Sequence, residues 1–378
     1  MPAARARAVL LIQTAFIGDV ILATSLLEYL HRTQPNTPVD FLVRKGNESL
    51  LQGHPHVRRV LVWDKKKDKY RGLWGLLRQI RQARYGRVVT LQRFASTGFL
   101  TALSGAPERV GFDKNPFAWG FTRAVPHVIG DGRHEVARNL ALLGNSEFGI
   151  MNSEVGSGHS AFPQTQGNSE FRITNSELSS GNSSLSVRPR LYPTPADEAA
   201  AAQAAGRAGG GPYICVAPTS VWFTKQFPEE QWLKLLAALP PQYTVFLLGG
   251  PPDAEACALL LARSPRPNVV NLAGQLSLVA SAALMRGAVL NYVNDSAPMH
   301  LCSAVDAPTC AVYCSTVPAF GFGPLSSFAR VVEVPHALEC RPCGLHGYQA
   351  CPLGHFRCAH DIHTSQLLAV LAEAEAVI

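Results

Sequence analysis

The stretch Ala8-Val-Leu-Leu-Ile-Gln-Thr-Ala-Phe-Ile-Gly-Asp-Val-Ile-Leu-Ala-Thr-Ser-Leu-Leu-Glu-Tyr-Leu-His-Arg32 decides the fold. Its first part, Ala8–Gln13, is a short and almost wholly apolar run, which is typical of a buried β-strand. From Val20 to Arg32 the apolar residues recur at helical spacing instead. A buried strand that leads through Gly18 and Asp19 into a helix is the opening of a parallel α/β sheet.

The same alternation continues along the chain on both sides of one polar stretch. Before that stretch we expect strands at 39–43, 60–63 and 88–91, and a helix at 73–84 that buries Leu76, Leu77 and Ile80. After it we expect strands at 213–217, 244–248, 269–272, 289–293 and 309–313, with helices at 229–239 and 253–262. The pattern predicts an α/β protein with two Rossmann-like halves, in which ligands bind at the carboxyl ends of the strands.

The polar stretch, residues 145–186, is rich in Asn, Ser, Gly and Glu. It holds a near-repeat, because residues 145–154 return with few changes as residues 168–177. This composition buries too little apolar surface to offset chain entropy, which predicts a disordered linker. We therefore divide the chain into a first domain at 1–144, a linker or insertion at 145–190, and a second domain at 191–378.

Charge is distributed unevenly over the 378 residues, which carry a formal net charge of +7. Residues 1–144 hold 22 Lys and Arg against 10 Asp and Glu, whereas residues 145–378 hold 12 against 17. A basic half predicts an anionic partner, such as nucleic acid, a membrane surface or a phosphorylated substrate. Apolar runs are too short for a membrane span. The nine cysteines favour a reducing compartment, and hence the cytoplasm.

Three loops after predicted strands carry candidate site residues. Asp19 follows Gly18 at a helix start, where it is either a cap or a general base. Lys225 is the only basic residue between Arg207 and Lys234, and it is either a phosphate contact or an ordinary exposed lysine. Asp295 precedes a helix whose first N–H groups would suit a diphosphate, although a simple cap is an equal alternative.

Other motifs argue against competing chemistries. The sequence has no Asp-x-Asp, no Gly-x-Gly-x-x-Gly after the first strand and no P-loop motif, so a metal–diphosphate clamp, dinucleotide binding and P-loop chemistry are disfavoured. Four cysteines, Cys340, Cys343, Cys351 and Cys358, have spacings near those of a zinc site without matching a standard one. We expect free thiols there rather than a structural zinc, and no metal in catalysis.

Taken together, these motifs resemble the ADP-heptose:lipopolysaccharide heptosyltransferases of glycosyltransferase family 9. The resemblance rests on Gly18-Asp19-Val, Lys225-x-Phe-Pro-x-x-x-Trp232, Gly249-Gly250, Asn294-Asp295-x-x-x-Met299-His300 and the cysteine tail. It covers most of the chain apart from residues 145–186. The sequence departs from the family at Ser296-Ala-Pro298, where many members have Thr-Gly.

The resemblance implies a GT-B fold and an inverting, metal-independent transfer of heptose from ADP-heptose to the lipopolysaccharide inner core. It implies that Asp19 is the general base and that Gly18 permits close backbone approach. It implies a donor site that comprises Thr219, Ser220, Lys225, Asp295, Ser296, Ala297, Met299 and His300. The acceptor would be a lipid-linked phosphorylated sugar, and the enzyme would act as a peripheral protein on the cytoplasmic face of the inner membrane.

The resemblance suggests an anionic partner for the basic first half of the chain. Lys65, Lys66, Lys67 and Arg93 are candidates for docking the acceptor or an anionic membrane, and the outward face of the 73–84 helix would help. Two alternatives stay open: a GT-B enzyme with another nucleotide-sugar donor, and a basic nucleic-acid-binding protein. Nucleic acid ranks last as a partner, because the basic stretch lacks recognition-helix or stacking patterns. The oligomeric state is left open.

Overall fold

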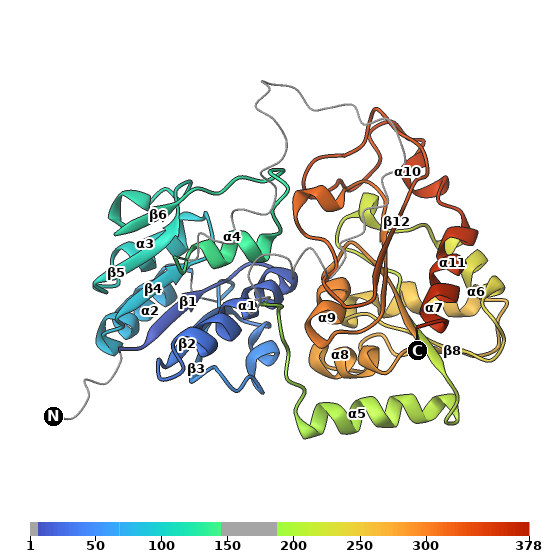
Figure 1. The fold of residues 1–378 in the computed structure, drawn as a ribbon, viewed down its shortest axis with the longest axis horizontal. Coiled ribbons are helices and arrows are strands. Elements are labelled where there is room, and N and C mark those ends of the chain that lie inside the picture. Colours follow the sequence, from blue (N-terminus) through green and yellow to red (C-terminus); the bar gives the residue numbers. More distant parts are fainter. Residues whose placement is uncertain (1–6, 68, 145–186, 378) are drawn as a thin grey trace.

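The computed structural model describes residues 7–67, 69–144 and 187–377, and the 145–186 stretch lies outside them. It contains two parallel six-stranded sheets, side by side in Figure 1, in the orders β3-β2-β1-β4-β5-β6 and β12-β11-β10-β7-β8-β9. Each order is that of a Rossmann fold, and the strand order reverses between the parallel neighbours β1 and β4 and between β7 and β10. The expected α/β class with two Rossmann-like halves is confirmed.

The first sheet is covered by helices on both faces. The side chains of β1 alternate between two cores, because Leu11 faces the core under α1 and α4 while Leu10 and Ile12 face the core under α2 and α3. Its elements are β1 (Val9–Ile12), α1 (Ile17–Thr33), β2 (Val39–Arg44), β3 (Arg59–Trp63), α2 (Lys69–Ala83), β4 (Arg87–Thr90), α3 (Ala95–Ala102), β5 (Glu108–Phe112), β6 (Arg123–Val125) and α4 (Glu135–Ala141).

The second sheet has α6, α7 and α11 on one face and α5, α8 and α9 on the other. Its elements are α5 (Pro195–Ala205), β7 (Tyr213–Ala217), α6 (Glu229–Ala238), β8 (Thr244–Leu247), α7 (Ala254–Arg263), β9 (Val269–Asn271), α8 (Leu278–Arg286), β10 (Leu290–Asn294), α9 (Ala297–Val305), β11 (Thr309–Tyr313), β12 (Ala329–Glu333), α10 (Arg357–His360) and α11 (Thr364–Glu375). Among the described helices none is long and apolar enough to cross a membrane.

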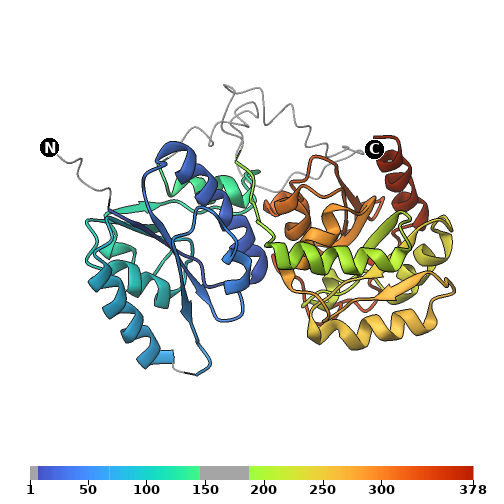
Figure 2. The same cartoon turned by 90° about the horizontal axis from the view of Figure 1, so that it is seen from below.

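The two sheets are joined by a shared apolar core. Helix α1 of the first half packs against α9 of the second (Figure 1), and residues of both belong to one buried cluster. The extended segment 187–194 runs between these two helices before α5 begins. Leu191 donates its N–H to the Ala304 carbonyl of α9, and Tyr192 donates its hydroxyl to Glu28 of α1 at 2.8 Å. Figure 2 shows the two halves meeting along this line.

The predicted strands and helices are present, but helices such as α3, α4, α5 and α8 had no predicted counterpart, and two further differences are instructive. Helix α1 begins at Ile17 rather than Val20, so Asp19 lies inside its first turn. The strands β5, β6 and β12 were not predicted. Each is short or mixes charged residues with apolar ones, as Glu108-Arg-Val-Gly-Phe112 does, and so lacks the continuous apolar run of a central strand.

Candidate active site

The predicted site residues lie at the two places where strand order reverses. Gly18 and Asp19 follow β1, whose neighbours are β2 and β4. Thr219 to Lys225 follow β7, and Asp295 follows β10, the strand hydrogen-bonded to β7. Crevices at such reversal points, at the carboxyl ends of the strands, are where open α/β sheets bind their ligands.

Gly18 brings the two reversal points into contact. A Cβ atom on Gly18 would lie 2.7 Å from Cδ2 of His300 in α9, so only glycine lets the start of α1 approach that ring so closely. His300 is buried, and its Nδ1 has no hydrogen-bond partner among the described residues. Burial lowers the pKa of His300 to about 4, against the opposing effect of the Asp295 carboxylate, so the ring is neutral at pH 7.

Asp19 occupies the third position of α1. The N-cap residue of α1 is Phe16. Asp19 Oδ2 accepts the Phe16 N–H at 3.2 Å, so the Asp19 side chain stabilises the start of the helix. Burial, together with the nearby charge of Glu135, raises the pKa of Asp19 to about 6. A carboxylate with a pKa near neutrality is a stronger base than an ordinary aspartate and is still mostly ionised at pH 7.

Glu135, which the sequence did not single out, is a buried anion at the start of α4. Arg138 donates from Nε to Glu135 Oε2 at 2.8 Å, and His127 Nε2 lies 3.6 Å from the same oxygen. Burial acts to raise the pKa of Glu135, but these two partners outweigh it and lower the pKa. Glu135 therefore keeps its charge beside Asp19. No strand-following motif precedes it, so the sequence offered no signal.

In the second half, Lys225 forms an ion pair that the sequence did not predict. Lys225 Nζ lies 2.6 Å from Asp295 Oδ2, and both side chains are largely buried. Thr316, in the loop after β11, donates its hydroxyl to the same oxygen at 2.6 Å. Asp295 thus holds the Lys225 side chain in place. The helix-cap interpretation of Asp295 is wrong, because Ser296 is the N-cap of α9. Thr316 could have been found by its place after a strand beside β10.

The start of α9 completes this group of residues. Ser296, Ala297 and Met299 lie at its first turn. Met299 donates its N–H to the Ser296 carbonyl at 3.1 Å, whereas the N–H groups of Ser296 and Ala297 precede the first helical hydrogen bonds. The Asn294 side chain accepts the Phe227 N–H at 2.9 Å and donates to the Thr219 carbonyl at 3.3 Å, so it ties the loop after β7 to β10. Thr219 and Ser220 are half-buried beside it. The donor residues expected from the sequence are therefore neighbours in space. Met299 is the exception as a ligand contact, because its side chain is fully buried and its N–H is bonded to the Ser296 carbonyl.

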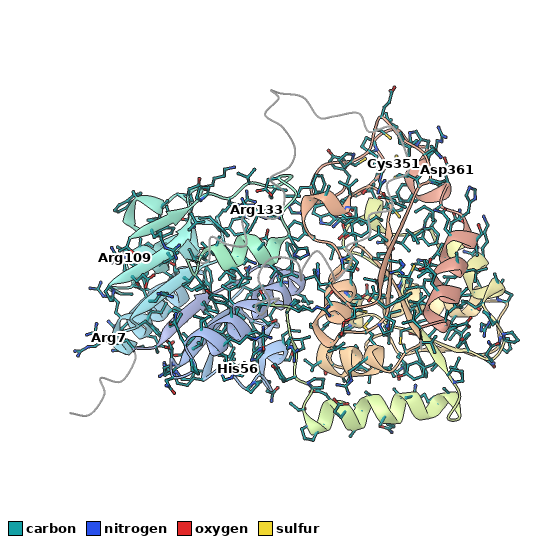
Figure 3. The ribbon with its side chains drawn as sticks, viewed as in Figure 1. Arg7, His56, Arg109, Arg133, Cys351 and Asp361 are labelled. Carbon is teal, nitrogen blue, oxygen red and sulfur yellow. The ribbon has the colours of Figure 1, made fainter. Side chains whose placement is uncertain are left out.

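The cysteine-rich loop supports this site from behind. Tyr348 donates its N–H to Thr224 Oγ1 at 2.7 Å, and Arg341 donates to the Thr316 carbonyl at 2.7 Å. A Cβ atom on Gly347 would lie 2.8 Å from Thr224 Oγ1 and 3.3 Å from Lys225 Cγ. The loop and α10 lie at one end of the second half, near the labelled Cys351 and Asp361 in Figure 3. Bracing the Lys225 loop is a function that the cysteine spacing did not reveal.

The cysteines themselves are free thiols. In the described ranges, no three His, Cys, Asp or Glu side chains are placed to hold a metal ion. Cys340 Sγ lies 3.9 Å from His355 Nε2, and Cys343 donates to the Cys340 carbonyl. Burial raises the pKa of Cys343, and it raises that of Cys358 to about 12, so neither is an activated nucleophile.

The predicted docking residues have different surroundings. Lys65 donates to the Thr14 carbonyl at 3.2 Å and lies over the Trp63 ring, so it is partly used within the domain. Burial lowers its pKa. Lys66, Lys67 and Arg93 are exposed at the carboxyl edge of the first sheet. These three side chains are the ones free to meet an acceptor or a surface.

Comparisons with known proteins identify the family of the chain. The family model of glycosyltransferase family 9 (heptosyltransferase) matches residues 73–347. Lipopolysaccharide heptosyltransferase 1 of Pseudomonas aeruginosa is 24% identical over 350 residues, which cover 89% of this chain and 85% of that protein. Lipopolysaccharide heptosyltransferase 3 of Escherichia coli is 24% identical over 80% of this chain and 82% of its own length.

Solved structures show the same architecture. The E. coli ADP-heptose lps heptosyltransferase II superposes with a TM-score of 0.72 at 21% identity, covering 97% of this chain and 99% of that one. A family 9 glycosyl transferase from Veillonella parvula gives a TM-score of 0.74 at 19% identity, covering 97% of each chain. The expected GT-B fold is confirmed, and the chain belongs to glycosyltransferase family 9, the heptosyltransferases.

Proposed function

We propose that this glycosyltransferase moves heptose from ADP-heptose to the inner core of lipopolysaccharide, with inversion at the transferred carbon and without a catalytic metal. The acceptor would be a lipid-linked phosphorylated sugar, met by a peripheral enzyme at the cytoplasmic face of the inner membrane. The names of the relatives support the donor and acceptor, since they are lipopolysaccharide heptosyltransferases.

Asp19 is the general base in this proposal. An acceptor hydroxyl forms a bond to the anomeric carbon of the heptose while the bond from that carbon to the diphosphate oxygen breaks, and Asp19 takes the hydroxyl proton. Attack from the face opposite the leaving ADP inverts the configuration. The raised pKa of Asp19, about 6, supports this role because the carboxylate is ionised at pH 7 and binds a proton more strongly than an ordinary aspartate.

Lys225 and the start of α9 stabilise the leaving ADP. Lys225 is held at one N–H by Asp295, which leaves its other N–H groups for the diphosphate. The N–H groups of Ser296 and Ala297 and the positive end of α9 add to this charge stabilisation. The lack of an Asp-x-Asp motif fits a leaving group neutralised by a lysine and a helix terminus.

One observation carries the proposal: the close contact of Gly18 with His300, which joins the Asp19 turn to the helix that begins beside Asp295. A base on one half and a diphosphate site on the other are what glycosyl transfer between two bound substrates requires.

The test is ADP release from ADP-heptose and a delipidated inner-core acceptor, with EDTA present. We expect turnover by the wild type, a loss of at least a thousandfold in kcat for Asp19→Asn, and little change for the matched control Asp113→Asn, an exposed aspartate of the same domain. Full activity of Asp19→Asn would refute the base, dependence on added metal would refute the metal-free mechanism, and consumption of another nucleotide sugar alone would favour the alternative donor.

A further inference from the structure

The outer face of the first domain carries a surface that the reaction does not use. Helices α2 and α3 cover the side of the first sheet that faces away from the second half. On the opposite side α1 packs against α9, and the turn Glu48–Leu51 packs against α8. Residues on α2, together with Lys114 and Trp119 after β5, form what we call the α2 surface: Arg71, Trp74, Arg78, Arg81, Lys114 and Trp119. The site chemistry described above involves none of them.

Two tryptophans on the α2 surface are exposed to an unusual degree. Trp74 is 62% exposed and Trp119 is 79% exposed. Between them the rings of Phe99 and Phe117 form a continuous row of contacts, with centroid distances of 5.3 Å from Trp74 to Phe99, 5.9 Å from Phe99 to Phe117 and 6.3 Å from Phe117 to Trp119. The row fixes two indoles at the surface, and clustered exposed aromatic area of this kind marks an interaction site.

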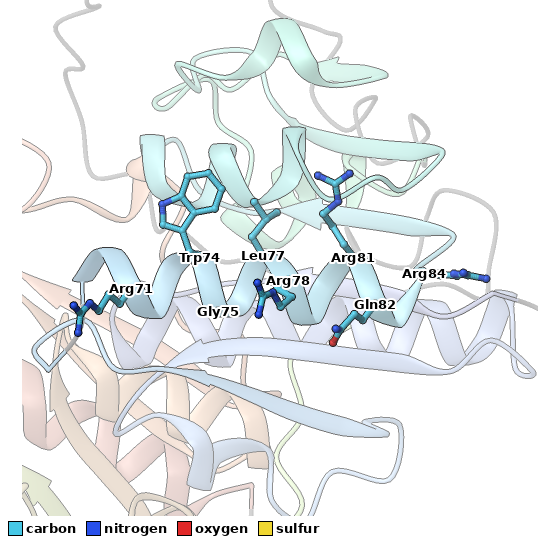
Figure 4. Close-up of a pocket in the computed structure, with 8 residues that line it drawn as sticks. All are labelled: Arg71, Trp74, Gly75, Leu77, Arg78, Arg81, Gln82 and Arg84. Carbon is cyan, nitrogen blue, oxygen red and sulfur yellow. The ribbon is translucent and has the colours of Figure 1, made fainter.

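Positive charge surrounds the row. From residue 69 to residue 107 the sequence has seven Lys and Arg and no Asp or Glu. Arg71, Trp74, Leu77, Arg78 and Arg81 line an open hollow of about 1020 Å³ along α2 (Figure 4). In the part of the chain that the structure describes, Arg71, Arg78 and Arg81 form no ion pair, whereas Arg58 and Arg59 of the same domain are paired with Asp40.

The position of this surface points to its occupant. Trp74 lies near the start of α2, which follows β3, so it lies toward the carboxyl edge of the sheet where Asp19 also lies. The α2 surface extends from there along the outer face to Trp119, whose neighbour Gly120 accepts a hydrogen bond from Arg109 near the start of β5. An acceptor anchored in a bilayer must reach Asp19 from that edge. Indole rings favour the interfacial region of a bilayer, and arginines bind its anionic headgroups.

We propose that the α2 surface docks the enzyme on a bilayer that contains anionic lipids, with Trp74 and Trp119 entering the headgroup region while Arg71, Arg78 and Arg81 contact lipid phosphates. This inference rests on the proposed function for its orientation, because a lipid-linked acceptor places the bilayer beside Asp19. It assigns to the α2 surface a role separate from catalysis.

Sedimentation with unilamellar vesicles tests this docking. At 0.1 M salt we expect binding to phosphatidylcholine vesicles that contain 30% phosphatidylglycerol, and binding to pure phosphatidylcholine weaker by tenfold or more. Arg78→Glu/Arg81→Glu should weaken binding at least tenfold. The control Lys234→Glu/Arg263→Glu has the same net charge, alters exposed residues of the second half and should bind like the wild type. Trp74→Ala/Trp119→Ala should weaken binding several-fold and abolish indole quenching by brominated lipids.

Activity measurements on the same variants distinguish a failure of the membrane docking from a failure of the proposed heptosyl transfer. The α2 variants should keep wild-type ADP release with the delipidated acceptor, which also shows that they fold. Equal vesicle binding by the α2 variants and their control would overturn the docking, as would affinity for single-stranded DNA without affinity for vesicles. A wild type that binds vesicles through the α2 surface but transfers no heptose would refute the function and leave the docking standing.

Discussion

At the residue scale, Asp19 derives its chemistry from what surrounds it rather than from its identity. Burial and the fixed charge of Glu135 raise its pKa to about 6. Glu135 keeps its charge because Arg138 and His127 hold it. Two carboxylates near one another therefore have pKa values displaced in opposite directions, which is a common way to separate a base from a structural anion.

This displacement predicts a pH profile. Asp19 must be ionised to accept a proton, so kcat/KM should fall tenfold per pH unit below about pH 6. Glu135→Gln removes the neighbouring charge and should move this limb to lower pH. A limb that stays in place in Glu135→Gln would show that Glu135 does not act on Asp19.

The same shift predicts an effect on stability. Between about pH 4 and 6 the folded chain holds a proton on Asp19 that the unfolded chain has released, so stability falls as the pH rises through this window. At pH 7 the Asp19→Asn variant should therefore be more stable than the wild type by roughly 1–2 kcal/mol. Urea unfolding at pH 7 measures this, and a destabilised variant would contradict the burial of the charge.

At the element scale, helix starts and loops are arranged by close contacts that only glycine allows. Gly18 lets the first turn of α1 approach the His300 ring, and Gly347 lets the cysteine-rich loop approach Thr224 and Lys225. The sequence predicted the strand that ends before Gly18 and the strand that ends before Thr224, because continuous apolar runs identify central strands. It could not predict the contacts, since they join residues about 280 and 120 positions apart.

Gly18→Ala tests the approach of α1 to α9. The added methyl group would lie 2.7 Å from His300 Cδ2, so the helices must separate by a few tenths of an ångström or more. We expect kcat to fall by tenfold or more while the second half still binds ADP with nearly wild-type affinity, as measured by calorimetry. Gly75→Ala on α2, where the new methyl meets nothing within 4 Å, is the matched control. Unchanged kcat in Gly18→Ala would refute the need for this contact.

At the scale of the whole molecule, polar contacts hold the loop after β11 against the first half. Arg138, fully buried, donates to the Phe320 carbonyl at 2.8 Å, Glu135 donates its N–H to Gly321 at 2.7 Å, and His134 Nε2 lies 3.1 Å from the Gly323 carbonyl. Thr316, which contacts Asp295, belongs to the same loop. The halves are thus joined at the base site and at the donor site together.

Arg138→Ala should disrupt this connection. It leaves the Glu135 carboxylate with His127 alone and the Phe320 carbonyl without its donor, so we expect a loss of about 3–5 kcal/mol in unfolding free energy. The control Arg263→Ala removes an exposed ion pair and should cost less than about 1 kcal/mol. Similar losses in the two variants, measured by urea unfolding, would show that Arg138 is not essential to the junction.

Much of this architecture could be predicted from the sequence because hydrophobic periodicity and strand-following loops are local signals. They placed Asp19, Lys225 and Asp295 on loops at the carboxyl ends of strands. The Lys225–Asp295 pair, Glu135, Thr316 and the bracing by Tyr348 depend on tertiary packing, which no local pattern encodes.

The central claim is that two strand-order reversals, one in each half, form a single transfer site. A crystal structure of the protein with ADP tests it most directly. We predict that the diphosphate lies at the start of α9 within hydrogen-bond distance of Lys225 Nζ, with Asp19 facing it from the first half. A diphosphate bound away from Lys225 and α9, or an Asp19 carboxylate turned away from it, would contradict the account.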